Sequence, residues 1–155
     1  MPQMNKGGKF IFGKSRIRED GSLHFPPQTL SEYSISSEGK LYLFTGSKST
    51  GGFCVTRKGL LLPSKLGFIL KECPDLCEYQ LSEGEFIPYK GRSYGWVSVS
   101  DDGIIRLNEN VLSFLGLSIG MSLLSIRSSD IAFTMGAKGP LLDKASRYDG
   151  VIEEY

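Results

Sequence analysis

The sequence predicts a mainly β protein in which one small unit occurs twice, joined by a short helical linker. Glycine makes up 19 of the 155 residues, about 12% against a typical value of roughly 7%, which indicates many tight turns between short elements. Hydrophobic residues are 40% and charged residues 23% of the chain, as in folded rather than disordered proteins. The repeat of turn and strand patterns described next is the third observation behind this prediction.

Two Asp-Gly turns define the repeat, because Gly21 and Gly103 stand 82 residues apart and each follows an aspartate. At the same offset apolar positions coincide: Ile17 with Val99, Leu23 with Ile105, Phe25 with Leu107, Leu30 with Leu112, Ile35 with Leu117, and Leu41 with Leu123. Beyond residues 46–52, which are rich in Gly, Ser and Thr, the offset becomes 80 and Phe53 meets Phe133. Insertions are tolerated in such exposed turns, so the pattern indicates a duplication.

Four segments follow from this repeat. We expect a first unit at residues 9–59, a linker at 60–91, a second unit at 92–140 and a C-terminal tail at 141–155. A unit of about 45 residues buries little apolar surface alone, so two units are expected to share one core.

Each unit is expected to contain the same elements in the same order. An alternating first strand (residues 10–19 and 95–100) leads through the Asp-Gly hairpin turn to a short strand (22–25 and 104–107). A helix of about two turns follows, with Pro26-Pro27 in the first turn of one copy and Asn108 as N-cap of the other. Two further strands close the unit, at residues 40–45 with 53–56 and at 122–127 with 131–135.

The linker has helical periodicity. Leu66, Ile69, Leu70 and Cys73 recur at i, i+3, i+4 and i+7, which predicts a helix that starts near Pro63 and ends at Pro74. Residues 84–95 are expected to form a loop with a short strand, and residues 141–147 a last short helix.

Charge is distributed unevenly along the chain. Residues 1–59 hold nine Lys and Arg against four Asp and Glu, a net charge of +5, whereas residues 60–91 and 92–155 each carry −2. Lys14, Arg16 and Arg18 alternate in the first strand, so their side chains point to one face, and Lys9 can extend this row. Such a row is suited to phosphate contacts, although cations on an edge strand also protect against aggregation.

Other candidate DNA contacts follow from hydrogen-bonding capacity. Arg16, Arg18, His24 and Gln28 carry the groups that read base edges. At the Lys14 position the second unit has Trp96, so we expect that face to be covered there by the linker or by a second chain.

Residues 13–46 resemble the AbrB/SpoVT-like swapped-hairpin DNA-binding domain family. The resemblance is carried by Asp20-Gly21, Leu23, Phe25-Pro26, Leu30, Ile35, Gly39 and Leu41, and in the second unit by Asp102-Gly103, Ile105, Leu107, Leu112, Leu117, Gly120 and Leu123-Leu124. It implies an intertwined β-barrel of units that exchange hairpins, and a transcriptional regulator that binds duplex DNA as a homo-oligomer, usually a dimer. The tandem arrangement is similar to that of MraZ-type proteins.

Metal, enzymatic and scaffolding functions are the alternatives. Cys73, Cys77, Cys54 and His24 form one zinc-type ligand set, but no second paired motif supports it, so neither a metal nor a cofactor is predicted. No nucleophile elbow or phosphate-binding loop is present, so no enzyme is predicted. The alternative to a DNA-binding regulator is an oligomerisation scaffold or an antitoxin-like module that binds a protein partner through the second unit or the linker.

Overall fold

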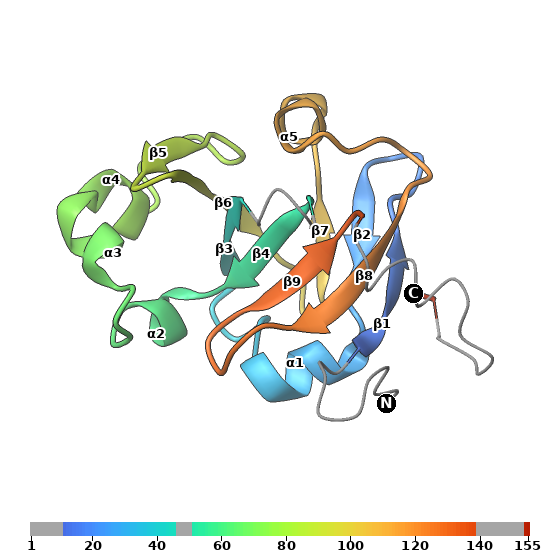
Figure 1. The fold of residues 1–155 in the computed structure, drawn as a ribbon, viewed down its shortest axis with the longest axis horizontal. Helices are drawn as coiled ribbons and strands as arrows, with labels where there is room; N and C mark the ends of the chain where they lie inside the picture. The colour runs from blue at the N-terminus through green and yellow to red at the C-terminus, as the bar shows by residue number, and fades with distance from the viewer. Residues whose placement is uncertain (1–10, 46–50, 139–153) are drawn as a thin grey trace.

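The computed structural model describes residues 11–45, 51–138 and 154–155 (Figure 1). The first predicted unit, called the first segment below, contains four strands and a helix. These are β1 (Ile11–Arg16), β2 (Ser22–His24), α1 (Pro27–Tyr33), β3 (Lys40–Thr45) and β4 (Phe53–Thr56). The second predicted unit, called the second segment, repeats this order with β6 (Arg92–Ser98), β7 (Ile104–Arg106), α5 (Glu109–Leu115), β8 (Ser122–Arg127) and β9 (Phe133–Gly136). The mainly β class predicted from the sequence is confirmed.

Local chemistry explains how the two equivalent helices begin. The Asn108 side chain accepts a hydrogen bond from the Val111 N–H, as expected for an N-cap, and Gly116 ends α5 in the left-handed conformation. Helix α1 has no side-chain cap but starts with Pro27, whose missing N–H costs nothing in the first turn.

Strands of the two segments pair mainly with each other. The larger sheet has the order β1-β8-β9-β4-β3-β6-β5 and is antiparallel throughout, and β2 and β7 form a second, two-stranded sheet. The pairs β1–β8, β3–β6, β4–β9 and β2–β7 all join one segment to the other. Each segment donates an equivalent backbone hydrogen bond to the Asp-Gly turn of the other. Leu107 N–H donates to Gly21 O at 2.8 Å, and Phe25 N–H donates to Gly103 O at 2.9 Å.

The larger sheet stays open. Within the described residues, β1 and β5 at its two ends do not pair with each other, and the three-residue strand β5 (Ile87–Tyr89) takes the free edge of β6. These strands therefore do not form the closed barrel that the resemblance implies.

Apolar side chains form two clusters on the opposite faces of the sheet. The larger cluster lies beneath β2, β7 and the two equivalent helices and contains Phe25, Phe53 and Phe133, all fully buried. The second cluster packs Tyr42 and Phe44 of β3 against the linker residues Ile69, Leu70 and Leu76. The linker is therefore part of the core.

The linker differs from the single helix that its periodicity predicts. It forms three short helices, α2 (Lys58–Leu61), α3 (Phe68–Glu72) and α4 (Pro74–Cys77). Ile69 and Leu70 of the predicted stripe are buried, but Leu66 precedes α3 and is 55% exposed. Pro74 ends α3, as expected, and also opens α4.

In the described residues, no helix has the length and apolar character needed to cross a bilayer. Lys9 and the expected helix at 141–147 lie outside the described residues.

Candidate nucleic-acid interface

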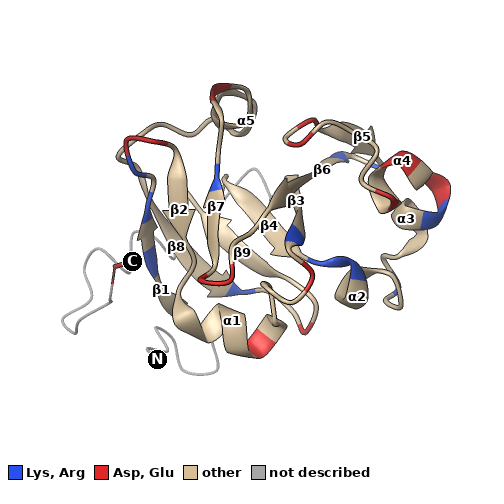
Figure 2. Cartoon of the chain, turned by 180° about the vertical axis from the view of Figure 1, so that it is seen from behind, with Lys and Arg blue, Asp and Glu red and all other residues tan. Residues whose placement is uncertain are grey.

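A row of cations follows the edge strand β1 and the turn after it. Lys14, Arg16 and Arg18 alternate with the fully buried Ser15 and Ile17, so the three cationic side chains share the outward face. Strand β1 pairs along one side with β8, and Figure 2 shows the basic positions at this end of the molecule. The row is therefore presented at the margin of the sheet.

The second segment adds a cation next to this row. Arg18 N–H donates to Ser22 O at 3.0 Å, and Ser22 lies opposite Arg106 in the β2–β7 pair. Arg106 is exposed and was not among the residues predicted from the sequence. The pairing of the two segments places it there, and the one signal in the sequence was that Arg106 is equivalent to the candidate His24 at the offset of 82.

A carboxylate lies among these cations. Asp20 accepts a hydrogen bond from Ser22 N–H at 2.9 Å and pairs with Arg106 at 3.4 Å. Hydrogen bonds from Ser22, with a smaller contribution from Arg106, hold the pKa of the Asp20 carboxyl below its ordinary value. Asp20 is therefore charged at neutral pH and offsets part of the positive potential at the turn.

Residues 154–155 lie against the outer edge of β1. Tyr155 N–H donates to Lys14 O at 2.8 Å, and Arg16 N–H donates to Tyr155 O at 3.3 Å. Glu154 pairs with Arg16 at 3.2 Å and accepts a hydrogen bond from the Ser122 hydroxyl at 2.8 Å. This contact was not predicted from the sequence, which indicated a loose acidic tail.

His24 and Gln28 occupy different surroundings. The His24 ring lies edge-on to Tyr155, with centroids 6.3 Å apart, and its Nε2 is 3.0 Å from Asp102 O. Gln28 lies in the first turn of α1, and its side chain donates to Glu32 of the same helix at 3.4 Å. The structure thus brings His24 toward the β1 edge through Tyr155 and leaves Gln28 on α1.

The equivalent strand of the second segment carries no cations at the matching positions. Trp96 replaces Lys14, and its indole N–H donates to Leu81 O at 2.8 Å while its ring meets Tyr79 edge-on at 5.6 Å. Ser98 replaces Arg16, and its N–H donates to Glu83 at 2.7 Å. The expectation that Trp96 is covered by the linker is confirmed, and the two first strands are chemically distinct.

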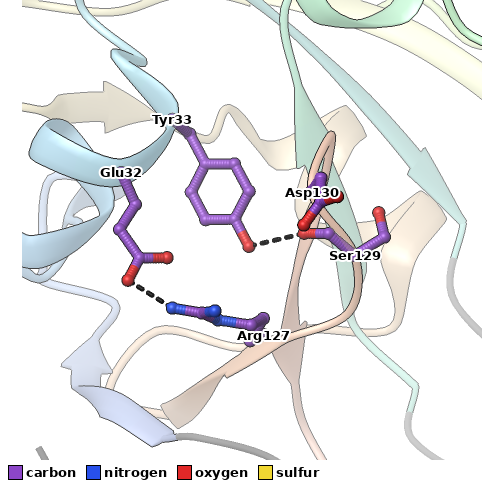
Figure 3. Close-up of a pocket in the computed structure, with 5 residues that line it drawn as sticks. All are labelled: Glu32, Tyr33, Arg127, Ser129 and Asp130. Carbon is purple, nitrogen blue, oxygen red and sulfur yellow. Dashed lines mark hydrogen bonds and ion pairs between the residues drawn. The ribbon is translucent and has the colours of Figure 1, made fainter.

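An open polar pocket of about 350 Å³ lies between α1 and the β8–β9 turn (Figure 3). Arg127 and Glu32 form an ion pair across it, and the Tyr33 hydroxyl donates to Ser129 O at 2.9 Å. Burial raises the pKa of Tyr33 to about 12, so its phenol stays protonated at neutral pH. The cation of this pocket is already neutralised by Glu32, and Asp130 adds a further carboxylate, so the pocket is poorly suited to an anion.

The cysteines have the environments of packed side chains. Cys54 is buried, and burial raises the pKa of its thiol. Cys73 and Cys77 are half-buried and also free. In the part of the chain that the structure describes, no three His, Cys, Asp or Glu side chains are grouped so that they could hold a metal ion.

Comparison of the chain with protein-family profiles, with curated proteins and with solved structures finds no match. We therefore infer function from the residues of this chain and from their arrangement.

Proposed function

We propose that the protein is a DNA-binding transcriptional regulator of the AbrB/SpoVT type that contacts duplex DNA through the basic strand β1. One observation carries the proposal: Lys14, Arg16 and Arg18 share one outward face along the edge strand β1 and the residues that follow it, with Arg106 of the other segment beside them. The uneven distribution of charge along the chain supports it, since the first 59 residues carry a net charge of +5.

The dimensions of the row suit a polyanion. The four steps along an extended chain from Lys14 to Arg18 cover roughly 13 Å, and duplex DNA carries one negative charge per roughly 1.7 Å of its axis. Several phosphates thus come within reach of the three long side chains. Contacts of this kind supply affinity and salt dependence, whereas sequence choice depends on groups that reach base edges.

The pairing of the two segments supports the structural side of the proposal. Four strand pairs join the segments, including the β2–β7 pair of short strands that follow the Asp-Gly turns. We infer units of the swapped-hairpin kind that exchange their first strands within one chain. We also propose that the protein acts in the cytoplasm as a homo-oligomer, whose mass light scattering would give.

The test is a fluorescence-anisotropy titration of random-sequence duplex DNA at low and physiological salt. We expect binding that weakens steeply with salt, and an Arg16→Ala/Arg18→Ala variant that binds more weakly with a log–log salt slope flatter by up to about 2. A Lys65→Ala/Lys71→Ala variant removes the same charge from the linker, at the opposite end of the molecule from β1, and serves as the matched control (Figures 1 and 2).

Two results would overturn the proposal. One is the lack of binding at low salt by folded protein. The other is an equal loss of affinity in the linker control, because the effect would then follow net charge and not the β1 row.

A protein-binding module is the second candidate, and one observation favours it. Three large apolar side chains that remain exposed lie in one short stretch of the linker, residues 62–68. They are Leu62, Leu66 and Phe68. Clustered apolar exposure is typical of interaction surfaces. A module of this kind would not bind DNA in the titration and would show concentration-dependent assembly instead.

A further inference from the structure

Residues 154–155 lie alongside the free edge of β1 and pair with it. Lys14 and Glu154 form a parallel bridge, and hydrogen bonds join Tyr155 to the backbones of Lys14 and Arg16. The backbone groups along this part of β1 are thus satisfied by the chain itself. An extended partner would have to displace these two residues in order to pair there.

The side chains of the two residues engage the groups assigned above to DNA. The Glu154 carboxylate is held by Arg16 at 3.2 Å on one side and by the Ser122 hydroxyl at 2.8 Å on the other. Tyr155 places its ring against His24, with centroids 6.3 Å apart. Arg18 and Arg106 lie further along the face, toward the Asp-Gly turn.

A carboxylate and a phosphate present the same chemistry to a guanidinium group. Both are anionic oxygen acceptors that arginine binds through its N–H donors. Glu154 therefore occupies the partner position on Arg16 that a DNA phosphate would take. Both cannot hold the same donors in the same geometry.

We propose that Glu154 and Tyr155 compete with DNA for strand β1, so that the protein carries an internal inhibitor of its own binding face. This inference depends on the proposed DNA-binding function and names a regulation of the same site. The inhibitor is weak and reversible, because the Arg16 and Glu154 side chains are 58% and 38% exposed and water screens the pair. DNA binding is therefore reduced and not abolished by this contact.

The test is Glu154→Gln, which keeps the size of the side chain and removes its charge. In the anisotropy titration at low salt, we expect this variant to bind random-sequence duplex DNA about two- to fivefold more tightly than wild type, the range expected for release of one exposed ion pair. The gain should shrink as salt rises, because salt screens the competing pair. Circular dichroism should show an unchanged fold.

Two controls separate competition from a general effect of charge. Glu78→Gln makes the same chemical change on an exposed residue after α4, far from β1 (Figure 1), and should bind like wild type. In an Arg16→Ala background, Glu154→Gln should have no further effect, because the pair that it breaks is already absent. Gains of equal size in Glu78→Gln, or an undiminished gain without Arg16, would overturn the inference.

Failure of the inference and failure of the proposed function give different results. If wild type binds with steep salt dependence and Glu154→Gln binds no more tightly, the inhibitor is refuted and the DNA-binding function stands. If neither protein binds at low salt, the function is refuted and the inference falls with it.

Discussion

Gly21 and Gly103 have the same backbone angle but different neighbours. Both have φ of +81°, a conformation that residues with a Cβ rarely adopt. A Cβ added at Gly21 would lie 2.4 Å from the carbonyl oxygen of Leu107, whereas at Gly103 it would lie 2.6 Å from the end of the Leu30 side chain. The Leu107 carbonyl belongs to the backbone after β7 and cannot turn away, but the Leu30 side chain can change its rotamer.

We therefore predict that Gly21→Ala destabilises the protein more than Gly103→Ala. The positive φ alone should lower the free energy of unfolding by about 1 kcal/mol in both variants, and the total loss for Gly103→Ala should be about 1–2 kcal/mol. Gly21→Ala adds a backbone clash and should lose about 3 kcal/mol or more. Equilibrium urea denaturation measures both, with Gly116→Ala as the control, since nothing lies within 4 Å of a Cβ there. Equal losses in the two turns would contradict this reading.

Elements with strong local patterns were predicted closely, and the linker shows where such prediction ends. Strands β3, β4 and β8 have the predicted bounds, because alternation, flanking turns and the repeat all point to the same residues. In the linker, by contrast, the predicted helix starts near Pro63, but α3 begins only at Phe68, and only its end before Pro74 agrees with the prediction. A Cβ added at Gly67 would lie 2.2 Å from Leu62 O, so the chain turns tightly just before α3, and Leu66 in this turn is exposed.

This difference leads to a prediction about two linker residues. Ile69→Ala should lower the free energy of unfolding by about 2–5 kcal/mol, because Ile69 is fully buried in the second cluster. Leu66→Ala should change it by less than about 0.5 kcal/mol, because Leu66 is largely exposed. Urea denaturation of both variants checks this. A small loss for Ile69→Ala would mean that the linker does not stabilise the sheet.

At the scale of the whole molecule, local sequence patterns do not predict contacts between residues that are distant in the sequence. The repeat predicted two similar units, but not which strands pair, nor that β5 takes the edge of β6. In the candidate interface, Lys14, Arg16 and Arg18 could be predicted from alternation alone. Arg106 and Glu154 could not, since pairing across 80 residues or more of sequence brings Arg106 to the Asp-Gly turn and Glu154 to β1.

The pairing across segments predicts that neither half of the chain folds alone. Separated at residue 91, each half keeps its own hairpin, β3–β4 or β8–β9, but loses the partners of its first two strands. The larger core cluster is also divided, since Phe25 and Phe53 pack with Phe133 of the other half. An isolated hairpin is marginal in water, so each half should show little cooperative unfolding as a monomer.

Mixing the halves should restore the strand pairs and a single cooperative transition. Circular dichroism during urea titration reports the sheet, and fluorescence of Trp96, which packs on the linker residues Tyr79 and Leu81, reports the contact of β6 with the linker. In the intact chain, both probes should give the same midpoint, because one core joins the segments. A half that unfolds cooperatively at a concentration where it is monomeric would show that the pairs between segments are dispensable, and two separate midpoints in the intact chain would show the same.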